Sequence, residues 1–574
     1  MGTYVLFSAA LFVAGILLSV VKNKEINRKA CLSSFGLAVL LLLFNYVICP
    51  VISWNTPAGY GEAIFFFLAM AVPLGEAGED DGCFCCGIVF ILLLILVGIW
   101  ISGWDFFRSG RQQKILQVTE TADSALRISP VPLEKMSIIN AAVAHNLAAQ
   151  KLGELQNKYV LGEFRKQSLT GSFRVTEFNG RETDVCFDNQ IVFVAPLEHG
   201  SVFKWFRNRY TEGYALVNAS DPSEYYLVKA VDGKELKLRY LQSACLGENI
   251  KRHVQMLYPH QLTGDYGIEL DNHGMPFNTV TMLENEFGFG TKTVSGTLVV
   301  DVQSGEIKEY SVENTPAWVN LIYPQEIVEE QIYYWGEYIH GWWNPSQRDR
   351  KEASPGMDIV YDPDGCSYYA GIQAKKTDSN SQSTATVGYM MVDTRSGEAT
   401  LFKRDGINET TAKAAMLADP SVANAVQLGT VVLDDATFYL IDGLHTYFAT
   451  FISPVDEMPK YFGFCNADTK EIVGIGSTLQ EAKAAYLKSA AQYRQRTGLR
   501  SNNDSKNAEQ TVTIAEKVQE GNCYFFRFKE TGDRVFYAYG ELLPEVRWKA
   551  EKVVISYTSS EDKLIPLTGF TAIK

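Results

Sequence analysis

The side chains best suited to recognition gather in one short segment, Tyr333-Tyr-Trp-Gly-Glu-Tyr-Ile-His-Gly-Trp-Trp343. Its six aromatic rings in eleven positions are more than one helix face can bury. Packing between domains is the favoured interpretation of these rings, and the alternative is a recognition surface or an interface anchor. For that alternative the candidate binding residues are Trp335, Tyr338, His340, Trp342 and Trp343.

No segment carries a catalytic signature. The seven histidines are dispersed without an H-E-x-x-H or H-x-H pair, so no local sequence presents two imidazoles to one metal. Gly288-Phe-Gly-Thr-Lys-Thr293 lacks the spacing of a phosphate loop and indicates a connection between strands. We therefore expect no catalytic residue, no cofactor and no metal site. An enzyme whose site assembles between units, using His340 and Glu337, is the alternative.

The part of the chain that must position the candidate binding residues contains a repeated sequence pattern. Hairpins are predicted wherever an apolar strand, an Asp or Asn turn and a return strand recur. This pattern occurs in four segments: Gly213–Tyr226, Gly296–Tyr310, Gly388–Phe402 and Phe462–Gly476. Three of them follow a second predicted hairpin, at Ile268–Leu283, Ile359–Ile372 and Phe438–Phe451. Helix-like stretches follow, at Cys245–Leu257, Gln325–Tyr338, Thr411–Leu417 with Ser421–Gln427, and Leu479–Tyr493.

The recurring unit is thus two hairpins and a helix, an α+β design that buries a modest core. Its strand-turn pattern, as in VVDVQSGE from Val299 to Glu306, resembles PepSY-type domains. At the ends of the body we predict a helix from Pro132 toward Leu155, and a small OB-like β-barrel after Thr511.

The first hundred residues are apolar and predict a membrane anchor. Tyr4–Val21, Leu32–Trp54 and Gly87–Trp104 are candidate transmembrane helices, while Ala63–Leu74 is short and contains Pro73, which favours a half-span. Basic residues follow the first and the last of these runs. Three spans plus a half-span would put both basic clusters on one side and the body in the cytoplasm. A fourth span, with an extracytoplasmic body, is the alternative.

Composition narrows the class of partner. The net charge of −14 disfavours nucleic acid, because nucleic-acid surfaces are basic. The cysteines of the body are scattered singly and predict no disulfide framework. A row of small β-rich units presents a long surface for protein contact. We expect an integral association with a membrane, a protein partner, and a possible homo-oligomer.

Three stretches together are similar to a group of uncharacterised bacterial or phage membrane proteins: Pro316–Val319, Val194–Gly200 and Trp335–Pro345. That resemblance implies no activity. The predicted function is a membrane-anchored, non-enzymatic scaffold or protein-binding module, in the cell envelope or related to a phage. The alternative is a PepSY-like regulator of a membrane-associated hydrolase. The predicted domains are an anchor (1–115), a helix with the first unit (116–260), three further units (261–345, 346–430, 431–497), a linker (498–510) and a barrel (511–574).

Overall fold

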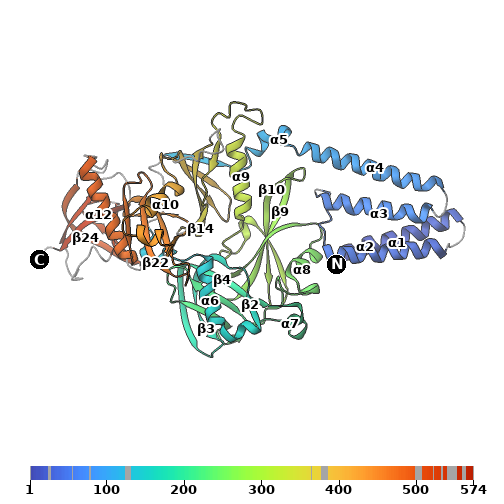
Figure 1. The fold of residues 1–574 in the computed structure, drawn as a ribbon, viewed down its shortest axis with the longest axis horizontal. Coiled ribbons are helices and arrows are strands. Elements are labelled where there is room, and N and C mark those ends of the chain that lie inside the picture. Colours follow the sequence, from blue (N-terminus) through green and yellow to red (C-terminus); the bar gives the residue numbers. More distant parts are fainter. Residues whose placement is uncertain are drawn as a thin grey trace.

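A helical arm, a β-rich body and a small barrel follow one another along the long axis of the molecule (Figure 1). The structure is a computed structural model. It describes residues 2–23, 28–54, 56–75, 79–122, 131–362, 365–375, 385–497, 507–520, 523–531, 534–539, 552–558 and 564–572. Most of the predicted linker, at 498–506, lies outside the described residues.

The arm consists of two helical hairpins that lie side by side (Figure 1). Its helices are α1 (Gly2–Asn23), α2 (Arg28–Ile48), α3 (Pro57–Gly75) and α4 (Glu79–Ser102). The short helix α5 (Asp105–Gln112) follows at an angle of 51° to the apolar part of α4 and leads into the body.

The prediction of N-terminal transmembrane helices is contradicted, and the predicted fold class is wrong in this respect. In the described part of the chain no single helix is long and apolar enough to cross a membrane. Only the bent pair Gly87–Ser102 with Asp105–Gln112 satisfies length and composition together. The physical reason is that polar residues enter the helices: α2 starts with Arg28 and α4 starts with Glu79, so the uninterrupted apolar lengths fall short of the roughly 20 residues required.

The body is built from four units, each a helix followed by two antiparallel hairpins. Unit 1 contains α6 (Ala141–Leu152), β3 (Arg165–Glu177), β4 (Glu182–His199), β5 (Tyr214–Asn218) and β6 (Tyr225–Val231). Unit 2 contains α8 (Ile250–Leu257), β8 (Leu262–Leu270), β9 (Pro276–Phe287), β10 (Thr291–Asp301) and β11 (Ile307–Ser311). Unit 3 contains α9 (Gln325–Glu337), β13 (Asp358–Asp362), β14 (Gly365–Ala374), β16 (Gly388–Asp393) and β17 (Ala399–Lys403). Unit 4 contains α10 (Glu409–Leu417), β20 (Thr437–Ile441), β21 (Leu444–Ile452), β22 (Pro459–Asn466) and β23 (Val473–Gly476).

The predicted hairpins are present: β5–β6, β10–β11, β16–β17 and β22–β23 occupy the four repeated segments. In every unit the residue after the Asp or Asn of that last turn accepts a backbone hydrogen bond from the segment that precedes the unit's helix. The four bonds run from Ile138 to Ala219 (2.8 Å), Tyr240 to Val302 (2.9 Å), Tyr323 to Thr394 (2.9 Å) and Ile407 to Ala467 (2.8 Å). Each helix therefore belongs, by packing, to the sheet that follows it in the sequence.

The repeated turns share one chemistry. In unit 2, Asp301 Oδ1 accepts a hydrogen bond from Gln303 N at 2.9 Å, and in unit 3 Asp393 Oδ1 accepts one from Arg395 N at 2.9 Å. The glycine that closes each turn, Gly305 or Gly397, has a φ of 77° or 72°. This left-handed conformation favours glycine, which explains the recurring Ser-Gly-Glu.

The units pack together, and their hydrophobic clusters cross from one to another. In unit 1 the strands close on themselves, because β3 pairs with β6 as well as with β4. One cluster joins Val143 and Leu147 of α6 to Tyr439 and Phe448 of unit 4. Shorter strands extend the sheets: β1 (Val118–Ala122), β2 (Tyr159–Leu161), β7 (Lys234–Glu235), β12 (Lys351–Ala353) and β19 (Val432–Leu433), while β15 (Ala385–Thr386) pairs with β18 (Gly406–Ile407).

The body ends with α12 (Leu479–Thr497), which packs on β22 and β23. After it comes a closed five-stranded barrel, in the order β24-β25-β26-β28-β27. Its strands are β24 (Asn507–Glu520), β25 (Cys523–Phe528), β26 (Val535–Tyr539), β27 (Lys552–Thr558) and β28 (Leu564–Ala572). The five strands predicted there are thus present, and they close around a core that includes Phe526 and Phe536.

Candidate functional site

Two of the five predicted binding residues are core residues. Trp335, on α9, lies in the hydrophobic cluster that this helix forms with the sheet of unit 3, and Lys351 Nζ lies 5.1 Å from its ring centroid. Tyr338 is buried just past the end of α9, where its ring stacks on that of Tyr334 at 6.0 Å. Trp335 thus faces the sheet, while Tyr338 is buried against Tyr334 and near Asp105 of α5, so neither ring is available to a partner.

His340 and Glu337, the predicted catalytic pair, have separate partners. The imidazole Nε2 of His340 lies 2.8 Å from Asp349 Oδ2 at the surface and holds the pKa of that carboxyl below its usual value. Glu337 is almost fully buried and forms ion pairs with Arg350 at 2.8 Å and Lys375 at 2.9 Å. The two side chains therefore have no partner in common.

Trp342 and Trp343 are exposed, by 42% and 75% of their side-chain surface. They extend the aromatic surface of α5. The ring of Trp342 packs edge-on against Phe106 with centroids 5.1 Å apart, and Trp342 N donates a hydrogen bond to Ser109 Oγ at 3.0 Å. The segment after α9 is thereby attached to the base of the helical arm.

Further exposed aromatic rings surround the same place. We call the whole set the aromatic collar: Trp54, Trp100, Trp104, Phe106, Phe107, Trp342 and Trp343. Trp100 packs against Trp104 and Phe106 against Phe107, at 5.4 and 5.0 Å between centroids. Sequence reasoning missed its N-terminal members. A signal was present, because Trp54 and Trp104 end apolar runs, where aromatic residues mark the boundary between an apolar phase and water.

The collar lies where the arm is fixed to unit 2. The tip of the β9–β10 hairpin, which the sequence predicts as a simple connection, reaches the bend between α4 and α5: a side chain on Gly288 would lie 3.2 Å from Gly103 Cα. Phe289, next to it, packs against Tyr60 of α3 at 6.0 Å. A second attachment joins Ile52 N to Pro259 O at 2.7 Å.

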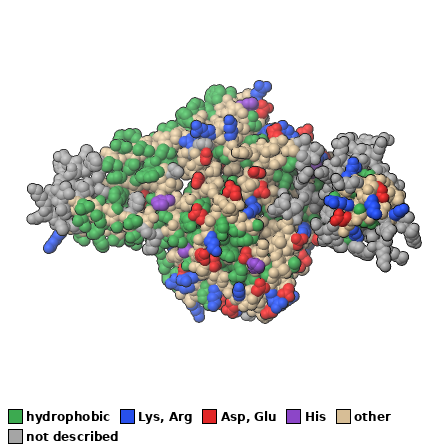
Figure 2. Space-filling model, turned by 180° about the vertical axis from the view of Figure 1, so that it is seen from behind, with side chains coloured by type: hydrophobic (Ala, Val, Ile, Leu, Met, Phe, Trp, Pro, Cys, Tyr) green, Lys and Arg blue, Asp and Glu red, His purple; other side chains and the backbone are tan. Residues whose placement is uncertain are grey.

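The surface of the arm is apolar. Large hydrophobic side chains are exposed along three of its helices, among them Leu6, Leu17, Leu32, Phe35, Leu40, Leu43, Val47, Phe90, Ile91 and Leu94. Figure 2 shows hydrophobic side chains over the arm and charged ones over the body. A contiguous apolar surface of this kind marks an interaction site.

Polar side chains lie inside the arm. Asn45 and Glu62 are buried, and Asn45 Nδ2 donates a hydrogen bond to Glu62 Oε2 at 3.3 Å. Ser8 and Ser34 are buried as well. The interior of the arm also holds an apolar cluster around Leu11 and Leu41, so the arm is apolar on its surface as well as inside. A helical bundle in water has a polar surface instead. We call this helical arm, with its apolar surface and its buried pair Asn45 and Glu62, the inverted arm.

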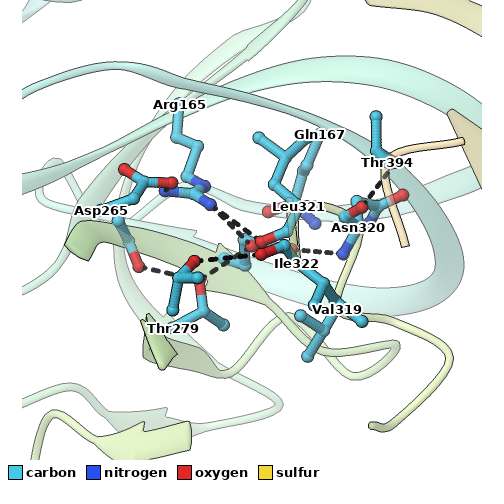
Figure 3. Close-up of polar contacts among 12 residues, drawn as sticks. Arg165, Gln167, Asp265, Thr279, Val319, Asn320, Leu321, Ile322 and Thr394 are labelled. Atoms are coloured by element: carbon cyan, nitrogen blue, oxygen red, sulfur yellow. Dashed lines mark hydrogen bonds and ion pairs between the residues drawn. The ribbon is translucent and has the colours of Figure 1, made fainter. Parts of the chain in front are cut away.

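A polar network joins three units beside a cleft (Figure 3). Arg165 of β3 contacts Asp265 at 3.0 Å and Glu269 at 3.3 Å, both on β8. Asn320, ahead of α9, donates from its backbone N to Glu269 Oε2 at 2.7 Å and accepts at its carbonyl from Thr394 Oγ1 at 2.7 Å. Burial raises the pKa of Glu269, against the opposing charge of Arg165.

The adjoining cleft has a volume of about 640 Å³. Burial raises the pKa of Glu198 on its wall, although Glu198 accepts a hydrogen bond from Ser243 N at 2.9 Å. Such a carboxyl is suited to proton donation. However, no His, Cys or Ser is among the described residues that line the cleft, and Lys166 is paired with Asp358 at 3.2 Å. We interpret the network as a structural junction between units.

The described residues contain no group of three or more His, Cys, Asp or Glu side chains able to hold a metal ion.

No protein-family model and no curated protein matches the sequence. A crystal structure of a levansucrase variant from B. megaterium aligns with 77% of this chain and 96% of its own, at 8% identity and a TM-score of 0.17. A TM-score this low carries no conclusion about fold or function.

Proposed function

We propose that this protein is a non-enzymatic binding platform that associates with lipid through its arm and offers its body to a protein partner. The observation that carries the proposal is the inverted arm, with Asn45 and Glu62 inside and leucine and phenylalanine side chains outside. Acyl chains match such a surface, because they need no hydrogen bonds. Association of this kind requires apolar area on the surface and makes no demand on helix length.

The body supports the second half of the proposal. Its four units have similar last hairpins and pack against one another, and the net charge of −14 falls within this part of the chain. We assign the surface of these packed units to a protein partner. Catalysis between units has less in its favour, since Glu337 and His340 contact different partners. Regulation of a membrane-associated hydrolase is the other predicted function.

Vesicle flotation tests the proposed association of the arm with lipid. Purified protein is mixed with phosphatidylcholine vesicles after detergent removal, and the floating fraction is measured. The test variant is Leu40→Gln/Leu43→Gln/Val47→Gln, at exposed positions of α2. The matched control is Leu428→Gln/Val432→Gln/Val455→Gln, at exposed positions of the body. Each apolar side chain that the lipid removes from water contributes about 1.5–3 kcal/mol to the free energy of binding.

We expect the wild type and the body variant to float and the arm variant to stay in solution. Equal flotation of the two variants would contradict the proposal, as would a wild type that remains dispersed below the vesicles.

A further inference from the structure

A second cavity lies between the arm and unit 2. Its volume is about 390 Å³. The end of α2 forms one wall with Val47 and Ile48, the first turn of α8 forms another with Lys251 and Arg252, and β8 closes it at 263–266. The cavity therefore has an apolar side on the arm and a cationic side on the body.

The two cations are available for an anion. Lys251 is exposed, with Nζ 5.6 Å from the centroid of Tyr266. The Arg252 guanidinium lies 5.1 Å from the centroid of Tyr46 on α2 and donates to Leu246 O at 3.0 Å, which holds it at the cavity. Neither has an ion-pair partner among the residues that the structure describes.

The acidic residue in the wall does not neutralise them. Asp265 is the one carboxylate among the described lining residues, and it is paired with Arg165 at 3.0 Å on the side of the polar network. It adopts a φ of 43° at a bulge in the β8–β9 pairing. The bulge turns this residue toward unit 1 and leaves Lys251 and Arg252 as the charges that face the arm.

The apolar wall of the cavity favours a lipid phosphate over a free phosphate as the bound anion. Val47 and Ile48 are exposed and continue the apolar surface of α2, so the cavity opens where that surface meets the cations. A free phosphate gains nothing from two aliphatic side chains. An amphiphile gains from both walls, with its phosphate at Lys251 and Arg252 and its acyl chains along α2.

We propose that this cavity binds the phosphate headgroup of an anionic lipid, and that the body thereby selects the lipid with which the arm associates. The inference rests on the proposed function, since it requires lipid at the arm. Lysine and arginine near an anionic surface each strengthen binding by about fivefold. Two contacts thus amount to a preference on the order of 25-fold for anionic over neutral vesicles.

The test compares vesicles of phosphatidylcholine alone with vesicles that also contain phosphatidylglycerol. The site variant is Lys251→Glu/Arg252→Glu. The matched control is Lys470→Glu/Lys488→Glu, which makes the same change of charge at exposed positions of unit 4 and α12. A thermal unfolding curve checks that each variant is folded, and Lys251→Gln serves as a milder substitution at a fully exposed side chain.

We expect the site variant to lose the preference for phosphatidylglycerol over phosphatidylcholine, Lys251→Gln to lose about fivefold of that preference, and the control to keep it. Equal loss in site and control variants, or no preference in the wild type, would overturn the site alone. A wild type that binds neither vesicle would overturn the proposed function with it. Displacement by inorganic phosphate, but not by chloride at equal ionic strength, would overturn the lipid as the source.

Discussion

The arm and the body distribute the same kinds of side chain in opposite ways. In the body many large apolar residues, such as Trp205 and Phe438, are fully buried. In the arm comparable residues such as Phe35 and Phe90 are exposed, and Asn45 is buried. Water drives apolar side chains inward, so the body is organised for water and the arm for an apolar neighbour. The aromatic collar lies at the boundary between them.

The boundary is visible within one sequence segment. Trp335 belongs to the core of unit 3 and Tyr338 is buried. Trp342 and Trp343, a few residues later, are exposed, and Trp342 packs against Phe106 of α5. A run of aromatic residues that looks uniform in the sequence therefore serves two purposes. The predictions below test that division and the inverted arm, in order of decreasing effect.

Replacing Trp335 and Trp343 in turn should separate core from surface. Trp335→Ala empties a buried site and should lower the free energy of unfolding by about 3–5 kcal/mol. Trp343→Ala removes an exposed ring and should change it by less than about 0.5 kcal/mol, while reducing vesicle binding. Urea unfolding and flotation measure the two effects. Equal destabilisation by both substitutions would show that the division is mistaken.

Removing the buried cation of the body should also be costly. Arg165→Met leaves Glu269 and Asp265 without their partner and should destabilise the body by about 3–5 kcal/mol. In Arg165→Met/Glu269→Gln the fully buried charge is gone and only the partly exposed Asp265 remains unpaired, so we expect most of the loss to be recovered. Chemical denaturation of the three proteins measures this. If the double variant is no more stable than the single one, the network does not depend on charge pairing.

Two turn glycines, one between β16 and β17 and one between β20 and β21, should differ in the stability lost on substitution. Gly397 and Gly443 both have a positive φ, of 72° and 76°. A side chain on Gly397 would meet the ring of Tyr323 at 2.4 Å, while nothing lies near Gly443. Gly443→Ala should cost about 1–2 kcal/mol from the backbone alone, and Gly397→Ala about 1–3 kcal/mol more from the collision. Similar losses would mean that the tyrosine moves aside without cost.

The pH dependence of body stability should respond to Glu409. Burial raises the pKa of this carboxyl, although it accepts hydrogen bonds from Ser354 Oγ and from Gly371 N. A raised pKa in the folded state means that the contribution of Glu409 is complete below its ordinary pKa and is lost as pH rises through the folded value. Stability of the wild type relative to Glu409→Gln should therefore fall over that range. If the wild type instead became more stable relative to Glu409→Gln as the pH rises, this assignment would be contradicted.

Local patterns predicted local structure. Alternation and turn residues located the four last hairpins, because strand period and a positive-φ glycine are properties of a few consecutive residues. The packing of each helix on the following sheet could not be read in this way. It depends on contacts such as Tyr323 N to Thr394 O, between residues far apart in the sequence.

The candidate site was predicted only in part for the same reason. Trp342 and Trp343 were among the predicted residues, but their neighbour Phe106 lies in α5, and only the fold brings them together. Hydropathy alone led to the mistaken transmembrane helices. It records that these runs are apolar on average. It does not show that α2 ends at Ile48, inside the predicted span Leu32–Trp54, or that a polar pair lies inside the arm.

Photo-crosslinking tests the central contrast most directly. Protein bound to phosphatidylcholine vesicles that contain a lipid with a photoactivatable group on its acyl chain is irradiated, digested and analysed by mass spectrometry. We predict labels on arm peptides, at 2–23, 28–54, 56–75 and 79–102, and none within 141–476 apart from the collar peptide that contains Trp342 and Trp343. Labels spread over the units of the body, or an unlabelled arm, would contradict the account.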